Sequence, residues 1–359
     1  AARFVQVMEL DEGSALLGFS AMDRPRERFG ERVKFLPVAY VVLAMLMLGI
    51  IFLSQHISPL LRSQDLLPHA RFRGWCELGV FVPTTVMVVI CYVRCILTHP
   101  GEIPEDPKWE YLARSRGNDA ESEPSAPVSL QETKKSGERR HCKWCGKFKP
   151  DRCHHCRVCR TCILKMDHHC PWIYNCVGFY NYKFFILLLF YSAIDSHLIL
   201  WSMTESLSRC VYDLETPFSE MFLVFFGEFL ALVLMVLVSS FLAMHLWLIS
   251  RGLTTIEFCE KVLPKDGRKK GNAMYDIGFY ANFRAALGQN VALWLLPMGT
   301  PDGDGLSFLS DESSLTKDFD GNLGTRCKTH QAAQRSRPSW PTYGTETAVP
   351  EHHSDQNIL

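Results

Sequence analysis

The sequence repeats one pattern of metal-binding residue types at an interval of fourteen residues. Each copy has a Cys-x2-Cys pair, a His ten residues after the pair, and another Cys seven residues after that His. Three thiolates and one imidazole form a closed tetrahedral zinc site, which leaves no position open for a substrate. We therefore predict two structural zinc ions in two interleaved quartets, namely Cys142, Cys145, His155 and Cys162, and Cys156, Cys159, His169 and Cys176.

Cys170 is a cysteine to which the repeat assigns no metal. It lies fourteen residues after Cys156, where a third copy would begin, but Ile173 takes the place of that copy's second cysteine. A neighbouring imidazole increases the thiolate fraction and the reactivity of a thiol. Neither quartet uses His168, so its ring could act as a base, and Asp167 could orient that ring. We favour this interpretation, in which Cys170 is the nucleophile, His168 the base and Asp167 the orienting acid, over the alternative that Cys170 is a spare buried thiol.

The first copy of the repeat is an internal control for this interpretation. Cys153 stands where the second copy has Asp167, so the zinc pattern does not require an acid at this position. An acid that zinc binding does not require indicates a catalytic role. Cys153 also adds a thiol near the site, and it could be oxidised or acylated.

Four apolar runs are long enough to cross a bilayer, because about 20 helical residues span a hydrocarbon core of ~30 Å. Buried core helices are the alternative, but four such runs beside a polar, cysteine-rich segment disfavour it. We expect an α-helical integral membrane protein with a two-zinc domain between its second and third spans. The predicted spans are 36–57, 76–97, 184–203 and 221–249, and the predicted cysteine-rich zinc domain is 139–183.

The charges that flank these runs predict the orientation, because cytosolic flanks carry an excess of Lys and Arg. Basic residues precede the first run, fill the loop before the third and follow the fourth, whereas 204–220 is mainly acidic. We therefore expect both termini and the zinc domain to be cytosolic, although arginines between the first two runs are a mild contradiction. The remaining predicted segments are a cytosolic N-terminal segment 1–35, a disordered linker 113–137, a cytosolic region 250–298 and a disordered tail 299–359. Within 250–298, an aromatic stretch is expected to lie against the membrane face or the zinc domain.

A basic cluster accompanies the cysteines, although the whole chain has no net formal charge. Small zinc modules with basic residues often bind nucleic acid. This one is tethered between two spans and has no long helix for a groove, so we expect no nucleic acid partner. We expect the cluster to bind phosphates of a cosubstrate such as CoA, or of lipid head groups. Its candidates are Lys143, Lys147, Lys149, Arg152, Arg157, Arg160 and Lys165.

A nucleophilic cysteine at a cytosolic membrane face would form a thioester or a disulfide. A thioester with a fatty acyl group fits best, because the neighbouring spans could receive the acyl chain. The donor would be an acyl carrier with phosphates, which explains the basic cluster. The acceptor would be the thiol of another protein.

The residues that carry this chemistry resemble a known family. His141–Phe185 is similar to the DHHC cysteine-rich domain of protein S-acyltransferases, the palmitoyltransferases. The likeness includes Lys149-Pro150-Asp151-Arg152, the run CILKMDHHCPW from Cys162 to Trp172, and NCVG from Asn175 to Gly178. Outside the domain, Thr254–Glu257 resembles the TTxE motif, and Tyr275–Gly288, with Asn282, resembles a short C-terminal aromatic motif. One departure is His99-Pro100-Gly101, where the family often has Asp-Pro-Gly after the second span.

The resemblance implies that Cys170 takes an acyl group, usually palmitoyl, from a fatty acyl-CoA and passes it to membrane-proximal cysteines of substrate proteins. It implies Asp167 and His168 as orienting acid and general base, and the two quartets as structural zinc sites. It also implies a multi-pass protein of the Golgi, the endoplasmic reticulum or the plasma membrane. Two rivals remain, a non-enzymatic membrane scaffold whose zinc module recruits partners, and a transporter.

The polar residues within the last two predicted spans include Asp195, His197 and Glu228. Such residues are costly in lipid and usually face the bundle interior. We expect neighbouring helices to satisfy His197 and Glu228. Asp195 lies eleven residues past Phe184, or roughly 16 Å deep at 1.5 Å per residue. A palmitoyl chain hung from the cytosolic face would end near that depth, so we expect Asp195 to disfavour longer chains.

Overall fold

The computed structural model describes residues 35–62, 68–111, 130–134, 136–213, 215–262, 274–299, 301 and 303–308. Four helices in this part of the chain are long and apolar enough to cross a membrane. The cysteine-rich segment lies between the second and third of them, so the predicted four-span architecture is confirmed. The predicted segment 1–35 (except its last residue) and most of the predicted linker and tail lie outside the described residues.

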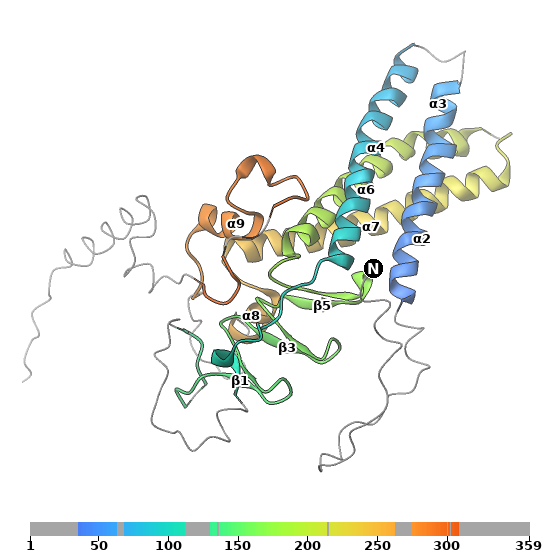
Figure 1. The fold of residues 1–359 in the computed structure, drawn as a ribbon. Helices are drawn as coiled ribbons and strands as arrows, with labels where there is room; N and C mark the ends of the chain where they lie inside the picture. Colours follow the sequence, from blue (N-terminus) through green and yellow to red (C-terminus); the bar gives the residue numbers. More distant parts are fainter. Residues whose placement is uncertain are drawn as a thin grey trace, which may run out of the picture.

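The helices form one bundle, with the short strands together at one end of it (Figure 1). The first span comprises α2 (Leu36–Ile51), a π-helix (Phe52–Ile57) and α3 (Ser58–Arg62). The other spans are α4 (Pro68–Leu97), α6 (Tyr182–Tyr212) and α7 (Phe218–Ser250), and α6 packs against both α4 and α7. Apolar residues cover the outer faces as well as the inner ones: Leu43 and Ile50 of α2 are exposed, whereas Leu48 and Ile51 are buried. A helix that is apolar on all sides is suited to lipid on one face and protein on the other.

Hydrogen bonds between helices satisfy several polar groups in the bundle. Asp195 accepts hydrogen bonds from the hydroxyls of Thr84 and Thr85 on α4. His56, in the π-helix, lies 2.8 Å from both Ser206 of α6 and Glu77 of α4, so it joins three spans. No local sequence pattern indicates this contact, because its partners are far apart in the chain.

Three antiparallel hairpins build the cysteine-rich module. They are β1 (His141–Cys142) with β2 (Lys147–Phe148), β3 (His154–Cys156) with β4 (Thr161–Ile163), and β5 (His168–Cys170) with β6 (Asn175–Val177). The second and third hairpins pair their residues in the same register, with His155 opposite Cys162 and His169 opposite Cys176. The fourteen-residue sequence repeat is therefore a structural repeat of hairpins.

The hairpin turns repeat at the same interval. Gly146, Arg160 and Tyr174 are spaced fourteen residues apart, and their φ angles are 64°, 57° and 47°. A left-handed backbone is unusual for residues other than glycine. At Arg160 and Tyr174 it is imposed by the tight turn that brings the ligands of each hairpin together.

A buried ion pair joins the module to the segment after α7. The guanidinium of Arg152 donates to both carboxylate oxygens of Glu257, at 2.7 and 2.8 Å, and to the carbonyl of Gly252 at 2.8 Å. Glu257 ends α8 (Thr255–Glu257), and a reciprocal pair of hydrogen bonds with Thr254 caps this helix. The rings of Tyr275 and Phe308 lie over the guanidinium, 4.5 and 5.2 Å away.

The aromatic stretch after α7 packs against the bundle. It contains α9 (Phe279–Leu287) and a 3-10 turn (Val291–Leu293). Lys183, at the start of α6, donates at 2.7 Å to the carbonyls of Leu293 and Met298, and the Tyr191 hydroxyl donates to that of Leu295. The stretch thus contacts α6 through these hydrogen bonds, and its first residue, Tyr275, lies over Arg152 of the cysteine-rich module.

Parts of the predicted linker and tail are ordered. The backbone N–H groups of Gln131 and Glu132 donate to the carboxylate of Asp151. Leu306 and Phe308 pack against the hydrophobic cluster that contains Phe179. The disorder predicted for 113–137 and 299–359 therefore does not extend to these residues.

The ion pair gives a stability prediction. Replacing Glu257 by Gln leaves the charge of Arg152 buried without a full partner, which typically costs about 3–5 kcal/mol. Unfolding of the detergent-solubilised protein would measure this loss. Glu138→Gln removes the exposed ion pair with Lys134 and is the matched control, for which we expect no change. Equal effects of the two changes would contradict the importance of the buried pair.

Candidate active site and metal centres

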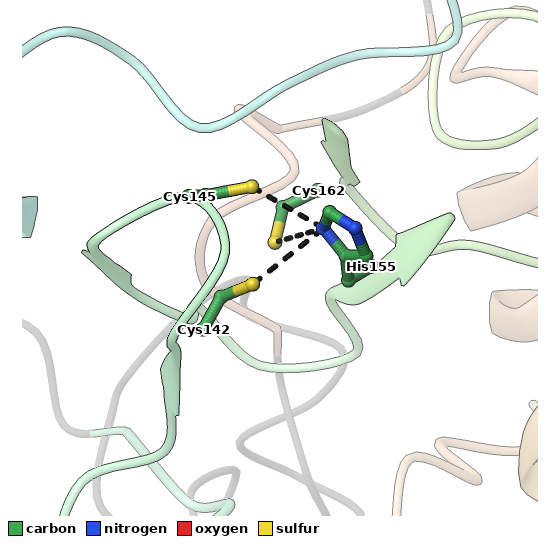
Figure 2. A group of neighbouring side chains, drawn as sticks. All are labelled: Cys142, Cys145, His155 and Cys162. Carbon is green, nitrogen blue, oxygen red and sulfur yellow. Dashed lines mark hydrogen bonds between the residues drawn. The ribbon is translucent and has the colours of Figure 1, made fainter. Parts of the chain in front are cut away.

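The first predicted quartet comes together around His155 (Figure 2). The sulfur atoms of Cys142, Cys145 and Cys162 lie 3.5, 3.2 and 3.9 Å from its Nδ1 atom. Ligands at zinc–sulfur and zinc–nitrogen distances of ~2.3 and ~2.0 Å in a tetrahedron are themselves about 3.5 Å apart. The donor set and its spacing therefore suit a tetrahedral metal ion.

The second predicted quartet is equally compact. The sulfur atoms of Cys159 and Cys176 each lie 3.5 Å from Nδ1 of His169, and they are 3.4 Å from one another. Cys156 completes the group, whose ligand atoms all lie within 4.8 Å of one another. Both quartets could hold a metal ion, with the ligands that the sequence repeat predicted.

Asp167 and His168 form a hydrogen-bonded pair at the start of the third hairpin. Nδ1 of His168 lies 2.7 Å from a carboxylate oxygen of Asp167, which is 1% exposed. Thr255 fixes the same carboxylate through its backbone N–H at 3.0 Å and its hydroxyl at 2.8 Å. The sequence indicated Thr255 only as part of a motif, and this contact shows what the residue touches.

The surroundings of Asp167 and His168 shift the pKa values of both groups away from their ordinary values. Burial raises the pKa of Asp167, but hydrogen bonds from His168 and Thr255 and the nearby imidazoles outweigh it and lower that pKa. Burial lowers the pKa of His168, but Asp167 and the sulfur of Cys170 outweigh it and raise that pKa to about 9. A cationic imidazole next to a sulfur is an arrangement that activates cysteine nucleophiles.

The first copy of the repeat supplies a contrasting histidine. His154 occupies the position of His168 but follows Cys153 instead of an acid. Burial, together with the charge of Arg140, lowers the pKa of His154 to about 4. The same hairpin position therefore holds a neutral imidazole in one copy and a cationic one in the other.

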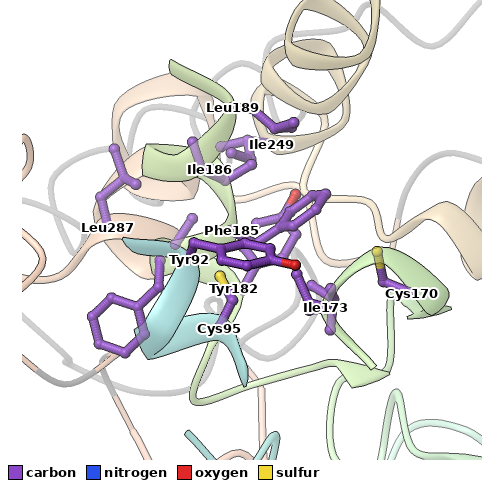
Figure 3. Packing of buried hydrophobic residues seen from close by; sticks show 13 residues of the cluster. Tyr92, Cys95, Cys170, Ile173, Tyr182, Phe185, Ile186, Leu189, Ile249 and Leu287 are labelled. Carbon is purple, nitrogen blue, oxygen red and sulfur yellow. The ribbon is translucent and has the colours of Figure 1, made fainter. Parts of the chain in front are cut away.

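Cys170 lies where the third hairpin meets the bundle. It belongs to a buried apolar cluster that includes Tyr92 and Cys95 of α4 and Tyr182 and Phe185 of α6 (Figure 3). Tyr92 also donates to the carbonyl of Trp172 at 2.8 Å. The thiol thus stands between an acid–base pair on one side and apolar side chains of the spans on the other.

His245 is a site residue that the sequence reasoning missed. It lies in α7, and a ring nitrogen of His245 is within 4.8 Å of Asp167 and His168 ligand atoms. The sequence signal that could have identified His245 is an ionisable residue in the last turns of a predicted span.

The predicted phosphate-binding residues differ in their surroundings. Lys143, Arg157 and Arg160 are exposed, and Lys147 and Lys149 are partly exposed. Lys165 lies beside the ring of Tyr182. Arg152 is buried and bound to Glu257, so it is not accessible to a phosphate.

At the departure from Asp-Pro-Gly, the His99 ring accepts a hydrogen bond from the N–H of Gly101 at 3.1 Å. An aspartate at this position could accept the same hydrogen bond. His99 therefore preserves an acceptor for the turn that follows α4.

Four membrane-crossing helices with a Cys/His metal module inserted between the second and third define a multi-pass membrane protein. A model of the family described as DHHC palmitoyltransferase matches residues 135–262. Palmitoyltransferase ZDHHC15 of Mus musculus is 40% identical over 188 residues, which cover 48% of this chain and 51% of that protein. Palmitoyltransferase ZDHHC2 of Mus musculus is 42% identical over 181 residues, which cover 48% of this chain and 47% of that protein.

Palmitoyltransferase ZDHHC20-B of Danio rerio is 36% identical over 241 residues, which cover 64% of this chain and 74% of that protein. The chain therefore belongs to the DHHC palmitoyltransferase family. It spans about half the length of the ZDHHC15 and ZDHHC2 relatives that it matches.

The two quartets predict the metal content. We expect about two zinc ions per chain in the purified protein, measured by plasma mass spectrometry, because each closed quartet binds one. Cys142→Ser should reduce the content to about one ion, since it removes one of four ligands. Cys170→Ser is the control and should leave the content unchanged. Wild-type protein without zinc would refute this assignment.

Proposed function

We propose that the protein is a protein-cysteine S-palmitoyltransferase that acts at the membrane surface. The observation that carries the proposal is the position of Cys170. Cys170 follows the hydrogen-bonded Asp167–His168 pair in the chain and packs in an apolar cluster with side chains of α4 and α6. The family membership and the names of the relatives support the same activity.

In the first step, the sulfur of Cys170 attacks the carbonyl carbon of a fatty acyl-CoA. A new carbon–sulfur bond forms, the bond to the CoA sulfur breaks, and CoA leaves as a thiol. The cationic His168 already holds the proton of the Cys170 thiolate and gives it to the leaving CoA sulfur, while Asp167 holds the ring. In the second step, the thiol of a substrate protein attacks acyl-Cys170, receives the acyl group and regenerates the Cys170 thiol.

The remaining parts have supporting roles in this proposal. The two quartets hold structural zinc ions, which stabilise a module of short hairpins with little apolar core. The exposed cations Lys143, Arg157 and Arg160 are candidates for the CoA or lipid phosphates. The module faces the cytosol of the Golgi, the endoplasmic reticulum or the plasma membrane, where CoA esters and substrate cysteines are available.

Labelled palmitoyl-CoA tests the reaction directly. Purified wild-type protein should acquire a label that hydroxylamine removes, because hydroxylamine cleaves thioesters. Cys170→Ser should abolish the label while zinc content is maintained. A label that survives this change, or none in the wild type, would favour the rival scaffold, and coupled solute flux would favour a transporter.

Asp195 gives a prediction on acyl-chain length. The carboxylate lies midway along α6, where it accepts hydrogen bonds from Thr84 and Thr85. We expect Asp195→Ala to increase the relative rate with acyl-CoAs longer than palmitoyl, because the added methylenes no longer meet a polar group. Competition between labelled acyl-CoAs of different lengths would measure the preference. An unchanged profile would mean that the hydrogen bonds of Asp195 serve helix packing only.

A further inference from the structure

His245 is a buried histidine that takes no part in the proposed reaction steps. Its side chain is 0% exposed, although it belongs to the cytosol-directed end of the α7 span in the proposed orientation. One of its ring nitrogens lies within 4.8 Å of both a carboxylate oxygen of Asp167 and a ring nitrogen of His168. Within the described chain, it is the residue that brings a second imidazole to the Asp167–His168 pair.

Three rings contact the imidazole of His168, and two of them are apolar. The ring centroids of Phe185, Phe241 and His245 lie 5.2, 6.1 and 5.9 Å from that of His168. His245 also packs edge-on against Phe185 at 5.1 Å and Phe241 at 4.7 Å. Phe241 and His245 are four residues apart in α7, so they project from the same face of the helix. Two membrane spans thus supply the rings that restrict the rotation of His168.

Packing alone does not require a histidine at this position. Nδ1 of His245 lies 3.4 Å from the hydroxyl of Tyr182, whereas Nε2 is buried without a hydrogen-bond partner among the described residues. A buried polar atom without a partner is destabilising, and a phenylalanine would avoid that cost. The polarity of this ring therefore calls for an explanation other than packing, and a role in catalysis is one such explanation.

We propose that His245 is a positioning residue for His168. Its ring helps to hold His168 in the orientation that serves both Asp167 and Cys170. Its dipole strengthens the hydrogen bond between Asp167 and His168, since electrostatic interactions are stronger in apolar surroundings than in water. This role rests on the proposed function, in which His168 moves the proton of Cys170.

Two substitutions separate polarity from packing. His245→Phe keeps an aromatic ring, and we expect it to lower the maximal rate of Cys170 acylation by about tenfold, a part of the ~100-fold or more that an acid–base partner contributes. The palmitoyl-CoA concentration for half-maximal rate should not change, because His245 acts on His168 and not on CoA. His245→Gln keeps a polar nitrogen near the place of Nε2 and should recover most of the lost rate.

His197→Phe is the matched control. His197 is a partly buried histidine of α6 that bonds to a carbonyl of its own helix, at Ala193, and its replacement should leave the acylation rate unchanged. A wild-type rate in His245→Phe would overturn the proposal. So would equal losses of rate, zinc and thermal stability in the Phe and Gln variants, because the ring would then serve folding alone.

Alkylation of Cys170 by iodoacetamide distinguishes failure of this proposal from failure of the proposed function. The reaction needs no acyl-CoA, and mass spectrometry of the Cys170 peptide gives its rate. Slower alkylation in His245→Phe supports the positioning role even if palmitoyl-CoA does not label the wild type. Equal alkylation in the wild type and the variant overturns the positioning role, even if acyl transfer is observed.

Discussion

A buried carboxylate needs several hydrogen bonds, and the way in which Asp167 obtains them determines how the cysteine-rich module sits on the membrane bundle. One partner, His168, is its neighbour in the chain, and the other, Thr255, lies just beyond the last span. Thr255 can reach Asp167 only when the segment after α7 is docked on the module. Arg152 and Glu257 fasten the same junction a short distance away. The acid of the candidate site is thus also part of the contact that holds the module in place.

The repeat shows how one backbone can carry two kinds of site. The second and third hairpins share their register, and each places a His and a Cys across from one another as metal ligands. They differ at the position before the paired histidines, where one has Cys153 and the other Asp167. The acid and the bundle together surround His168, whereas His154 lies near cations of its own module. The exchanges of Cys153 for Asp167 and of Cys159 for Ile173, placed against different surroundings, distinguish the two hairpins.

Several features followed from the sequence because they depend on local spacing or on composition. Long apolar runs identify spans whatever their neighbours are. A tetrahedral metal site demands four donors at short range, so the fourteen-residue register was enough to predict two quartets that could hold a metal ion and that exclude Cys170. By contrast, Arg152 looked like one more surface cation of a basic cluster. Its burial against Glu257 depends on a segment 105 residues away, which no local pattern contains. His245 was missed for the same reason.

By itself, the sequence determined the four apolar helices and the two Cys/His quartets that could hold a metal ion, because these depend on residue type and on distance along the chain. Only the tertiary structure decided which polar residues are shared between the module and the bundle. It placed Thr255 on Asp167, removed Arg152 from the solvent and brought the ring of His245 next to His168. The physical reason is that burial and hydrogen-bond satisfaction are properties of packed surfaces. Such surfaces form between segments whose order in the chain does not reveal their proximity.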